Sequence, residues 1–293
     1  MRISVIPTLL REILGKHEFN REPEPDLVMQ DKNQVAAFAE AGRIDGIMSA
    51  TYLFNTTRIS QIIQDCNKVL DLGCGPATQL AQIAQINPQI EFIGVDMSEN
   101  MLKNAKAYCD QLGVNNISFV RDDISTLNTI PDNSVDAVIS TLALHHLPSE
   151  RLLKNCFRQI RRVLRTEGAL FLMDLSRLKS LYSVLYFAYL NKKYQPAIFT
   201  LDYERSLRAA FSSEEFKQLA AEIFPEKKVQ ILSTALIPIL TIIKTEDKTL
   251  PQTTLEKIRK LSENLPKRYH NDLHDIRFLF KLSGLKNDPF SSR

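Results

Sequence analysis

The sequence predicts an α/β protein built on a mostly parallel sheet. Short apolar segments alternate with amphipathic segments over most of the chain, a pattern typical of strands connected by helices. Gly73 and Gly75 form a Gly-x-Gly loop between the first strand of this series and its helix. Acidic residues occur near the ends of the first two predicted strands, at Asp71 and Asp96. In open parallel sheets, ligands bind beyond the carboxyl ends of the strands, so these observations also indicate where a site would lie.

The first strand, loop and helix occupy residues 69–87. Gly73 and Gly75 lack side chains and allow the backbone to approach a ligand closely, although a tight turn alone would also explain them. We expect Pro76 in the first turn of the helix, where its missing N–H is tolerated, and Pro88 just beyond the helix end. A dinucleotide fingerprint requires a third glycine where this chain has Thr78, which disfavours a nicotinamide cofactor.

The second strand, residues 91–96, ends at Asp96. In nucleoside-binding folds an acid at this point accepts hydrogen bonds from the ribose hydroxyls. Met97 follows it and could place its thioether on an adenine ring. Asp96 could instead cap the next helix, as Ser98 could, and the two roles are compatible.

Three further strands are predicted at 117–120, 135–140 and 169–174, the last after a helix that ends near Gly168. Asp122, Asp123 and Ile124 follow the third strand. The fourth strand ends at Ser140 and leads into the pair His145–His146.

The run Asp71-x-Gly73-x-Gly75-x-Ala77 resembles the first motif of the class I S-adenosylmethionine-dependent methyltransferases, with Ala77 in place of the last glycine. Five strand–helix units in matching order extend this resemblance from about Lys68 to Asp174. The resemblance implies a three-layer Rossmann-like fold with a seven-stranded, mostly parallel sheet. It also implies S-adenosyl-L-methionine as the cofactor.

The resemblance further implies a set of cofactor-binding residues. Asp123 corresponds to the acid that binds the adenine amine, with Ile124 beside the ring, whereas Asp122 is expected to be a solvated turn residue. The end of the fourth strand, at Ser140, would lie under the methionine part of the cofactor. The predicted cofactor-binding residues are Asp71, Gly73, Gly75, Asp96, Met97, Asp123, Ile124 and Ser140.

The histidine pair would point toward the methyl acceptor. Histidine is suited to act as a base near neutral pH, which is required only if the acceptor must lose a proton. We predict His145 as the catalytic residue, since Leu147 and Pro148 fix the chain directly after His146. Polar packing at the start of a helix is the alternative role for both histidines.

The predicted organisation has three parts: residues 1–66 form an N-terminal segment and helical cap, 67–245 form the methyltransferase domain, and 246–293 form a helical C-terminal extension. The cap is expected to be largely helical over 34–65, after an extended linker at 23–26. The domain carries an aromatic-rich helical insertion at about 178–225, which is either a lid over the acceptor or ordinary core packing. A strand pair at 229–236 and 239–244 would complete the sheet, with an antiparallel last strand.

Composition argues against several classes of protein, including nucleic-acid-binding, disulfide-rich and membrane-spanning proteins. The 37 Lys and Arg residues nearly balance 34 Asp and Glu residues, which argues against a strong nucleic-acid surface. The basic residues between Lys154 and Arg165 could bind RNA, but they more often form the solvated face of an amphipathic helix. Four cysteines without a Cys-x-x-Cys pair indicate reduced thiols and a cytoplasmic protein. His270 and His274 lack a third ligand nearby, so we expect no metal, and no apolar segment is long enough to span a membrane.

These observations predict an S-adenosylmethionine-dependent methyltransferase that acts on a small-molecule acceptor by in-line displacement. An RNA or protein methyltransferase and a catalytically inactive cofactor-binding module are the alternatives. The sequence names neither the acceptor nor the oligomeric state.

Overall fold

The computed structural model describes residues 5–16, 19–26, 31–43 and 45–291. Its centre is one seven-stranded sheet in the order β3-β2-β1-β4-β5-β7-β6. All the strands run parallel except β7, which is antiparallel to both of its neighbours. The predicted seven-stranded, mostly parallel sheet is therefore confirmed. The strands are β1 Lys68–Leu72, β2 Glu91–Asp96, β3 Ile117–Arg121, β4 Val135–Thr141, β5 Leu164–Leu175, β6 Gln230–Ser233 and β7 Leu240–Lys244.

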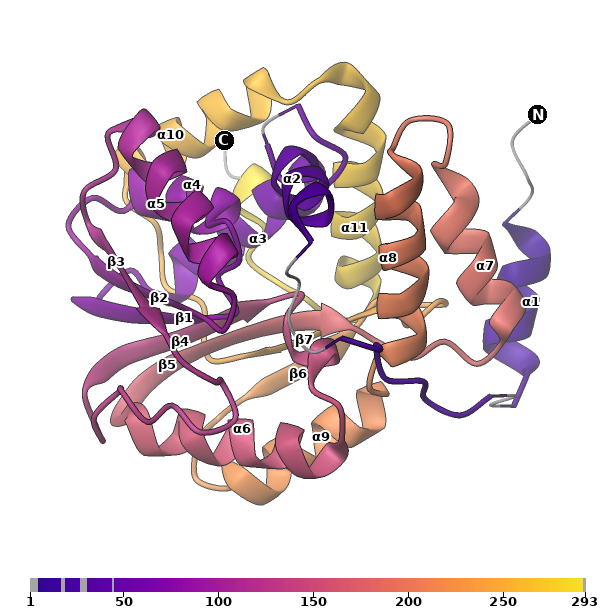
Figure 1. Ribbon diagram of the computed structural model, residues 1–293, viewed down its shortest axis with the longest axis horizontal. Coiled ribbons are helices and arrows are strands. Elements are labelled where there is room, and N and C mark those ends of the chain that lie inside the picture. Colours follow the sequence, from indigo (N-terminus) through magenta and orange to yellow (C-terminus); the bar gives the residue numbers. More distant parts are fainter. Residues whose placement is uncertain (1–4, 17–18, 27–30, 44, 292–293) are drawn as a thin grey trace.

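Helices cover both faces of this sheet, so the structure has three layers with the sheet in the middle (Figure 1). One face carries α3 Ser49–Ile62, α4 Thr78–Ile86, α5 Glu99–Leu112, α10 Gln252–Asn264 and α11 His270–Leu282. The opposite face carries α6 Glu150–Val163 and α9 Ser213–Ile223. Alternate strand residues enter the two cores, as Val69 and Leu70 of β1 do, because successive side chains of a strand point to opposite faces.

The remaining helices lie beyond the end of the sheet. They are α1 Ile6–Leu14, α2 Lys32–Ala41, α7 Leu181–Leu190 and α8 Ala197–Ala209, with a short 3₁₀ turn η1 at Leu144–His146. Helix α8 packs against α7, α2 and η1. Within the predicted insertion, α7 and α8 thus extend over the carboxyl ends of the strands, whereas α9 packs against α6 on the other side of the sheet. The C-terminal segment adds two 3₁₀ turns, η2 Lys267–Tyr269 and η3 Pro289–Ser291.

Two local predictions were wrong. Helix α4 begins at Thr78 rather than near Pro76, because Ala77 adopts a left-handed conformation with φ 56° and separates the proline from the helix. Helix α6 ends at Val163 rather than near Gly168. Strand β5 already begins at Leu164, which pairs with Val135 of β4, so sheet hydrogen bonding takes up residues that the sequence assigned to the helix. The predicted cap over 34–65 is helical in α2 and α3, although residue 44 lies outside the described residues.

Candidate active site

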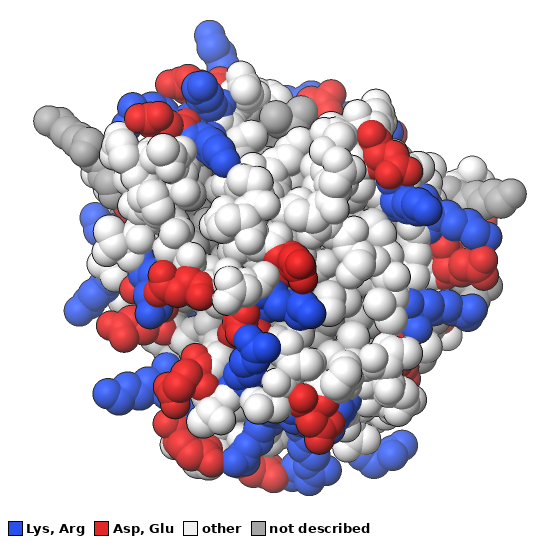
Figure 2. All heavy atoms as spheres, turned by 90° about the vertical axis from the view of Figure 1, so that its left-hand side faces the viewer, with Lys and Arg blue, Asp and Glu red and all other residues white. Residues whose placement is uncertain are grey.

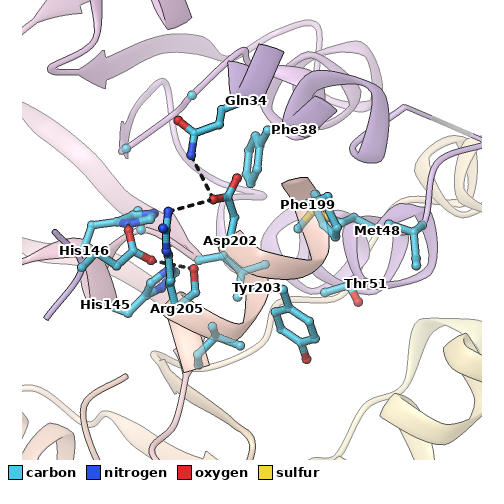
Figure 3. A pocket seen from close by; sticks show the side chains of 18 of the residues that line it. Gln34, Phe38, Met48, Thr51, His145, His146, Phe199, Asp202, Tyr203 and Arg205 are labelled. Atoms are coloured by element: carbon cyan, nitrogen blue, oxygen red, sulfur yellow. Dashed lines mark hydrogen bonds and ion pairs between the residues drawn. The ribbon is translucent and has the colours of Figure 1, made fainter. Parts of the chain in front are cut away.

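A cavity of about 400 Å³ opens at the carboxyl ends of the central strands, between the glycine loop and the lid helices (Figure 3). The loops after β1, β2 and β4 form its floor, and α2, α7 and α8 contribute its walls. The lining residues used below are Glu24, Gln34, Phe38, Gly73, Gly75, Asp96, Met97, Ile124, His145, His146, Phe187, Phe199, Asp202, Tyr203 and Arg205.

The glycine loop shapes one end of the cavity. Gly73 and Gly75 have φ of 71° and 53°, a region that side chains rarely adopt. A Cβ on Gly73 would lie 2.4 Å from the Cβ of Ala143, so Gly73 is needed for the loop to pack against the segment after β4. A Cβ on Gly75 would meet only Phe38, at 3.7 Å, which leaves the space in front of Gly75 open to the cavity.

Asp96 holds this loop and also faces the cavity. One carboxylate oxygen accepts a hydrogen bond from the Gly75 amide at 3.0 Å, and the other accepts one from the Ser98 amide at 2.8 Å. Burial raises the pKa of Asp96, although these amides oppose the shift. Ser98 provides the cap of α5 through its hydroxyl, so Asp96 is not the side chain that caps this helix. Each carboxylate oxygen has a second lone pair that could accept a ligand hydroxyl.

Replacing Asp96 by Ala is expected to weaken S-adenosylmethionine binding by about 1.5–3 kcal/mol, because hydrogen bonds to a charged acceptor are lost. Titration calorimetry measures this as a change in Kd. Asp122→Ala is the matched control, since Asp122 also accepts backbone amides, from Asp123 and Thr129, but does not line the cavity. Equal affinity of the Asp96 variant and the wild-type protein would contradict the ribose assignment.

Asp71 lies behind the loop and does not line the cavity. Its side chain is buried, and no described residue is found to donate a hydrogen bond to it. Burial, with a smaller effect from the Asp96 carboxylate, raises its pKa to about 7. A buried carboxylate directly behind the two glycines that line the cavity favours a cationic ligand there, and S-adenosylmethionine carries a sulfonium and an ammonium group. The residues present therefore fit the implied cofactor.

The Asp71→Asn variant is expected to be more stable than the wild-type protein at high pH. The folded pKa of about 7 exceeds the ordinary value of 3.8, so the wild-type protein loses stability as pH rises between these values. The loss is at most ~4 kcal/mol, at ~1.4 kcal/mol per pKa unit. Thermal melts from pH 4 to pH 8 should show the variant's advantage growing up to about pH 7 and then levelling. An advantage that does not change with pH would contradict the buried charge.

The other predicted cofactor residues divide into two groups. Met97 and Ile124 line the cavity. Asp123 does not; its carboxylate accepts a hydrogen bond from the Ser125 amide at 2.7 Å. The Ser140 hydroxyl is buried and donates to the Leu72 carbonyl at 2.9 Å. The roles of Asp123 and Ser140 therefore depend on the resemblance alone and stay predictions.

His145 lies at the centre of the cavity floor, in η1. Its Nδ1 is 2.6 Å from a carboxylate oxygen of Asp174, at the end of β5. The other Asp174 oxygen accepts the amides of Ala143 and Leu144, so the carboxylate is held on both sides. Because a carboxylate accepts hydrogen bonds, Nδ1 carries the proton and Nε2 keeps the free lone pair. Asp174 thus fixes the ring and its tautomer.

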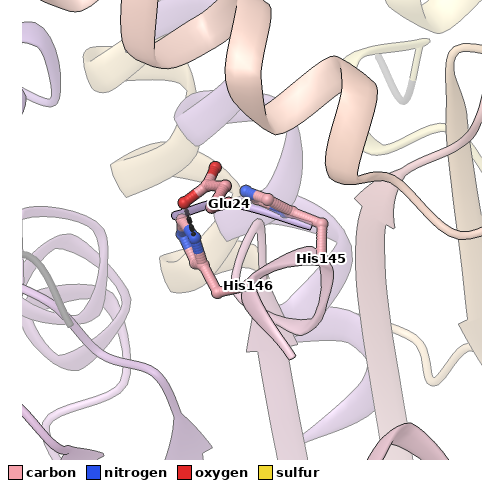
Figure 4. A group of neighbouring side chains, drawn as sticks. All are labelled: Glu24, His145 and His146. Carbon is pink, nitrogen blue, oxygen red and sulfur yellow. Dashed lines mark hydrogen bonds and ion pairs between the residues drawn. The ribbon is translucent and has the colours of Figure 1, made fainter. Parts of the chain in front are cut away.

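His146 pairs with a residue far away in the sequence. Its Nδ1 is 2.7 Å from Glu24, whose second oxygen accepts the Ser206 hydroxyl at 2.7 Å (Figure 4). Burial opposes charge on both partners, but their mutual hydrogen bond and attraction prevail: the pKa of His146 is raised and that of Glu24 is lowered to about 2. The pair thus fastens the N-terminal segment across the cavity mouth.

Glu24, His145 and His146 are the one group of potential metal ligands that converges among the described residues, with ligand atoms within 4.8 Å of one another. Hydrogen bonding already accounts for this arrangement. His145 Nδ1 is bonded to Asp174, and His146 Nδ1 to Glu24. We therefore interpret the three as a hydrogen-bond network around the cavity.

Sequence reasoning missed the residues that position the histidines. The predicted linker at 23–26 is held in place by Glu24, which pairs with His146. Arg21, just before it, donates to the carbonyls of His145, Leu147 and Pro148, and its guanidinium lies 3.8 Å from the centre of the Phe211 ring. No local signal marks Arg21 or Glu24. Asp174 could have been found, since it ends a predicted strand adjacent to the one that carries the histidines.

Helices α2 and α8 give the cavity both aromatic and polar wall residues. Phe38, Phe199 and Tyr203 contribute aromatic surface there (Figure 3). Asp202 of α8 accepts a hydrogen bond from the Gln34 side chain at 3.0 Å and lies 3.8 Å from Arg205. The aromatic residues of the insertion thus include cavity wall as well as packing residues.

Residues 63–198 match the family described as "Methyltransferase domain". The chain is 41% identical over 95 residues to the trans-aconitate 2-methyltransferase of Deinococcus radiodurans, covering 32% of this chain and 34% of that protein. It is 29% identical over 172 residues to a demethylmenaquinone methyltransferase of Listeria monocytogenes, covering 56% of this chain and 70% of that protein. Across several other curated relatives the chain spans about two fifths of their length or less.

Solved structures share the fold. The plantazolicin methyltransferase BamL, determined with a substrate analogue and S-adenosylhomocysteine, superposes with a TM-score of 0.56 at 19% identity, covering 81% of this chain and 85% of that one. A putative S-adenosylmethionine-dependent methyltransferase of Methanococcus maripaludis gives 0.54 at 17% identity, covering 80% of this chain and all of that one.

The strand order and the cavity at the carboxyl ends define the Rossmann-like methyltransferase class of fold. Residues 63–198, a little under half of the chain, match a methyltransferase domain, which agrees with the resemblance to the class I S-adenosylmethionine-dependent methyltransferases. The solved neighbours either contain S-adenosylhomocysteine or are described as S-adenosylmethionine-dependent methyltransferases, which agrees with the predicted cofactor.

Proposed function

We propose that the protein transfers the methyl group of S-adenosylmethionine to a hydroxyl group on a small, largely apolar acceptor. One observation carries the proposal: the glycine loop, Asp96, His145 and several apolar side chains all line a single cavity. One space could therefore hold both the methyl donor and its acceptor.

When bound, the cofactor supplies an electrophilic methyl group on its sulfonium. The chain aligns the acceptor with it and excludes water, and such alignment can contribute roughly 7–11 kcal/mol to lowering the barrier. His145 Nε2 would accept the acceptor's hydroxyl proton as the acceptor oxygen takes the methyl group, whose bond to sulfur would break and leave a neutral thioether. Asp174 acts as a positioning residue, because its carboxylate holds Nδ1–H and stabilises the imidazolium that forms.

The walls support an acceptor with an apolar body. Phe38, Phe187 and Phe199 would contact that body, while Asp202 and Arg205 offer a polar group to its rim. The names of the two relatives refer to an organic acid and to a quinone precursor, so they support a small molecule but agree on no single acceptor.

The surface charges support a small molecule over RNA. Four of the five basic residues between Lys154 and Arg165 form ion pairs: Lys154 with Glu222, Arg161 with Glu226, Arg162 with Asp132 and Arg165 with Asp136. On the face shown in Figure 2, acidic and basic side chains are intermingled. Neither arrangement offers the continuous basic groove that a nucleic-acid backbone requires.

Calorimetry with S-adenosylmethionine and with NAD, followed by an acceptor screen with a labelled methyl donor, tests the function. We expect binding of S-adenosylmethionine alone and label transfer to an apolar hydroxyl compound. Label transfer to RNA or protein in preference to every small molecule would overturn the acceptor class. Cofactor binding without transfer to any acceptor class would favour a catalytically inactive module.

A further inference from the structure

Helix α1 buries its polar side and exposes its apolar side. Thr8 and Glu12 are buried, and the Glu12 carboxylate accepts the backbone amide of Lys179 at 3.1 Å. The apolar residues follow the helical spacing i, i+4, i+7 and i+8 and point outward; they are Ile6 (61% exposed), Leu10, Ile13 and Leu14 (77% exposed). A helix on a soluble core normally has the reverse arrangement. Packing against the core therefore does not account for these exposed apolar residues, and we look for a binding partner that would cover them.

Helix α7 extends this apolar surface. Its outward residues Tyr182, Tyr189 and Leu190 are exposed, as is Tyr194 just after the helix, while Ser183 and Ala188 on the opposite side are buried. The two helices pack side by side (Figure 1). The Arg11 guanidinium lies 5.0 Å from the centre of the Tyr182 ring and connects the exposed residues of α1 with those of α7. We call the surface formed by the exposed residues of 5–16 and 182–194 the α1–α7 face.

The charges on the α1–α7 face have one sign. Arg11, Lys16, Lys192 and Lys193 are exposed within these two segments. The one acid in the same segments, Glu12, is buried against the Lys179 amide. The exposed charges within the two segments are therefore all cationic. Glu204 of α8 lies at the edge of this face, where it accepts the Tyr189 hydroxyl at 2.8 Å and pairs with Arg208.

The α1–α7 face also adjoins the roof of the cavity. Phe187 of α7, and Asn191 and Gln195 just after it, line the cavity from inside. One helix thus contacts the acceptor space with one side and solvent with the other. A partner bound to the α1–α7 face would therefore contact α7, the helix that also forms part of the cavity wall.

We propose that the α1–α7 face docks on the surface of an anionic phospholipid bilayer. Leucine and isoleucine side chains would enter the interface, tyrosines occupy the headgroup level that they favour, and the lysines and Arg11 attract lipid phosphates. A second copy of this chain would bring cations against cations, which disfavours self-association through this face. Docking would hold the lid against the bilayer, where an apolar acceptor is concentrated. None of the helices in the described part of the chain is long and apolar enough to cross a membrane, and the proposed contact is peripheral.

Vesicle co-sedimentation of the full chain tests this proposal. Phosphatidylcholine vesicles with and without phosphatidylglycerol are compared, at low and at high salt. The wild-type protein should sediment with the anionic vesicles and be released as salt rises, because screening weakens the attraction to the surface. We expect Leu10→Glu/Leu14→Glu to lower partitioning at least about tenfold, since it removes two apolar contacts and adds repulsion.

The matched control is Leu112→Glu/Leu282→Glu. It replaces two exposed leucines on α5 and α11 with the same change in charge. This control should partition like the wild-type protein, and thermal melts and cofactor affinity should match among all three proteins. The proposal is overturned if the wild-type protein ignores anionic vesicles, if it binds both vesicle types equally, or if the two double variants lose binding equally. Light scattering that shows a dimer abolished by Leu10→Glu/Leu14→Glu would instead assign the α1–α7 face to self-association.

Discussion

Replacing His145 by Ala should lower turnover by roughly 10²–10⁴-fold, the range typical of a lost general base. The ring is buried on the cavity floor, and Asp174 fixes it through Nδ1 with Nε2 free. The cofactor Kd should stay unchanged, because His145 contacts neither the glycine loop nor Asp96 by hydrogen bond among the described residues. Single-turnover rates measure the methyl-transfer step, and calorimetry on the same preparation measures the cofactor Kd.

Asp174→Asn provides the companion variant. An amide at this position no longer requires the Nδ1–H tautomer, so we expect a smaller loss of turnover together with an altered pH profile. Profiles over pH 6–9 bracket the ordinary histidine pKa of roughly 6.5. Full activity of His145→Ala across this range would show that alignment alone accounts for the rate, and a pH profile unaltered by Asp174→Asn would remove the positioning role.

Gly75→Val should abolish cofactor binding. Gly75 has φ of 53° and its amide bonds to Asp96, and the space in front of it belongs to the cavity. A branched side chain would occupy the path of the ligand and would also be strained at this φ. Calorimetry should detect no binding of S-adenosylmethionine.

Gly113→Val controls for backbone strain. Gly113 has φ of 66° at the end of α5, and a Cβ there would meet nothing within 4 Å. This variant should lose a comparable amount of stability from strain but bind the cofactor normally. If Gly113→Val also lost binding, or if Gly75→Val kept it, the loop would not be the cofactor site.

The sheet was predictable because its signals are local. Each strand is an apolar run bounded by turn residues, and each crossover helix has its own periodicity, so the succession of strands along the chain follows from local patterns. The seven-stranded sheet was implied by the family resemblance, and the structure confirms it and gives the strand order. The boundary between α6 and β5 was less predictable, because residues that continue the helical pattern form sheet hydrogen bonds instead. Leu164 was assigned to the helix, but pairing with Val135 in β4 makes it part of β5.

The sequence by itself determined which residues near the strand ends line the cavity. Gly73, Gly75, Asp96 and Met97 lie within three residues of a strand end, and parallel strands bring such ends to one edge. Only the tertiary structure decided which distant segments close around them. Glu24 meets His146 across 122 positions, Gln34 meets Asp202 across 168, and Asp174 meets His145 across 29. It also decided that α1 shows its apolar side to solvent, which the helical pattern alone would have assigned to the core. Local sequence fixes which residues form a strand or helix, whereas contacts between distant segments depend on how those elements pack.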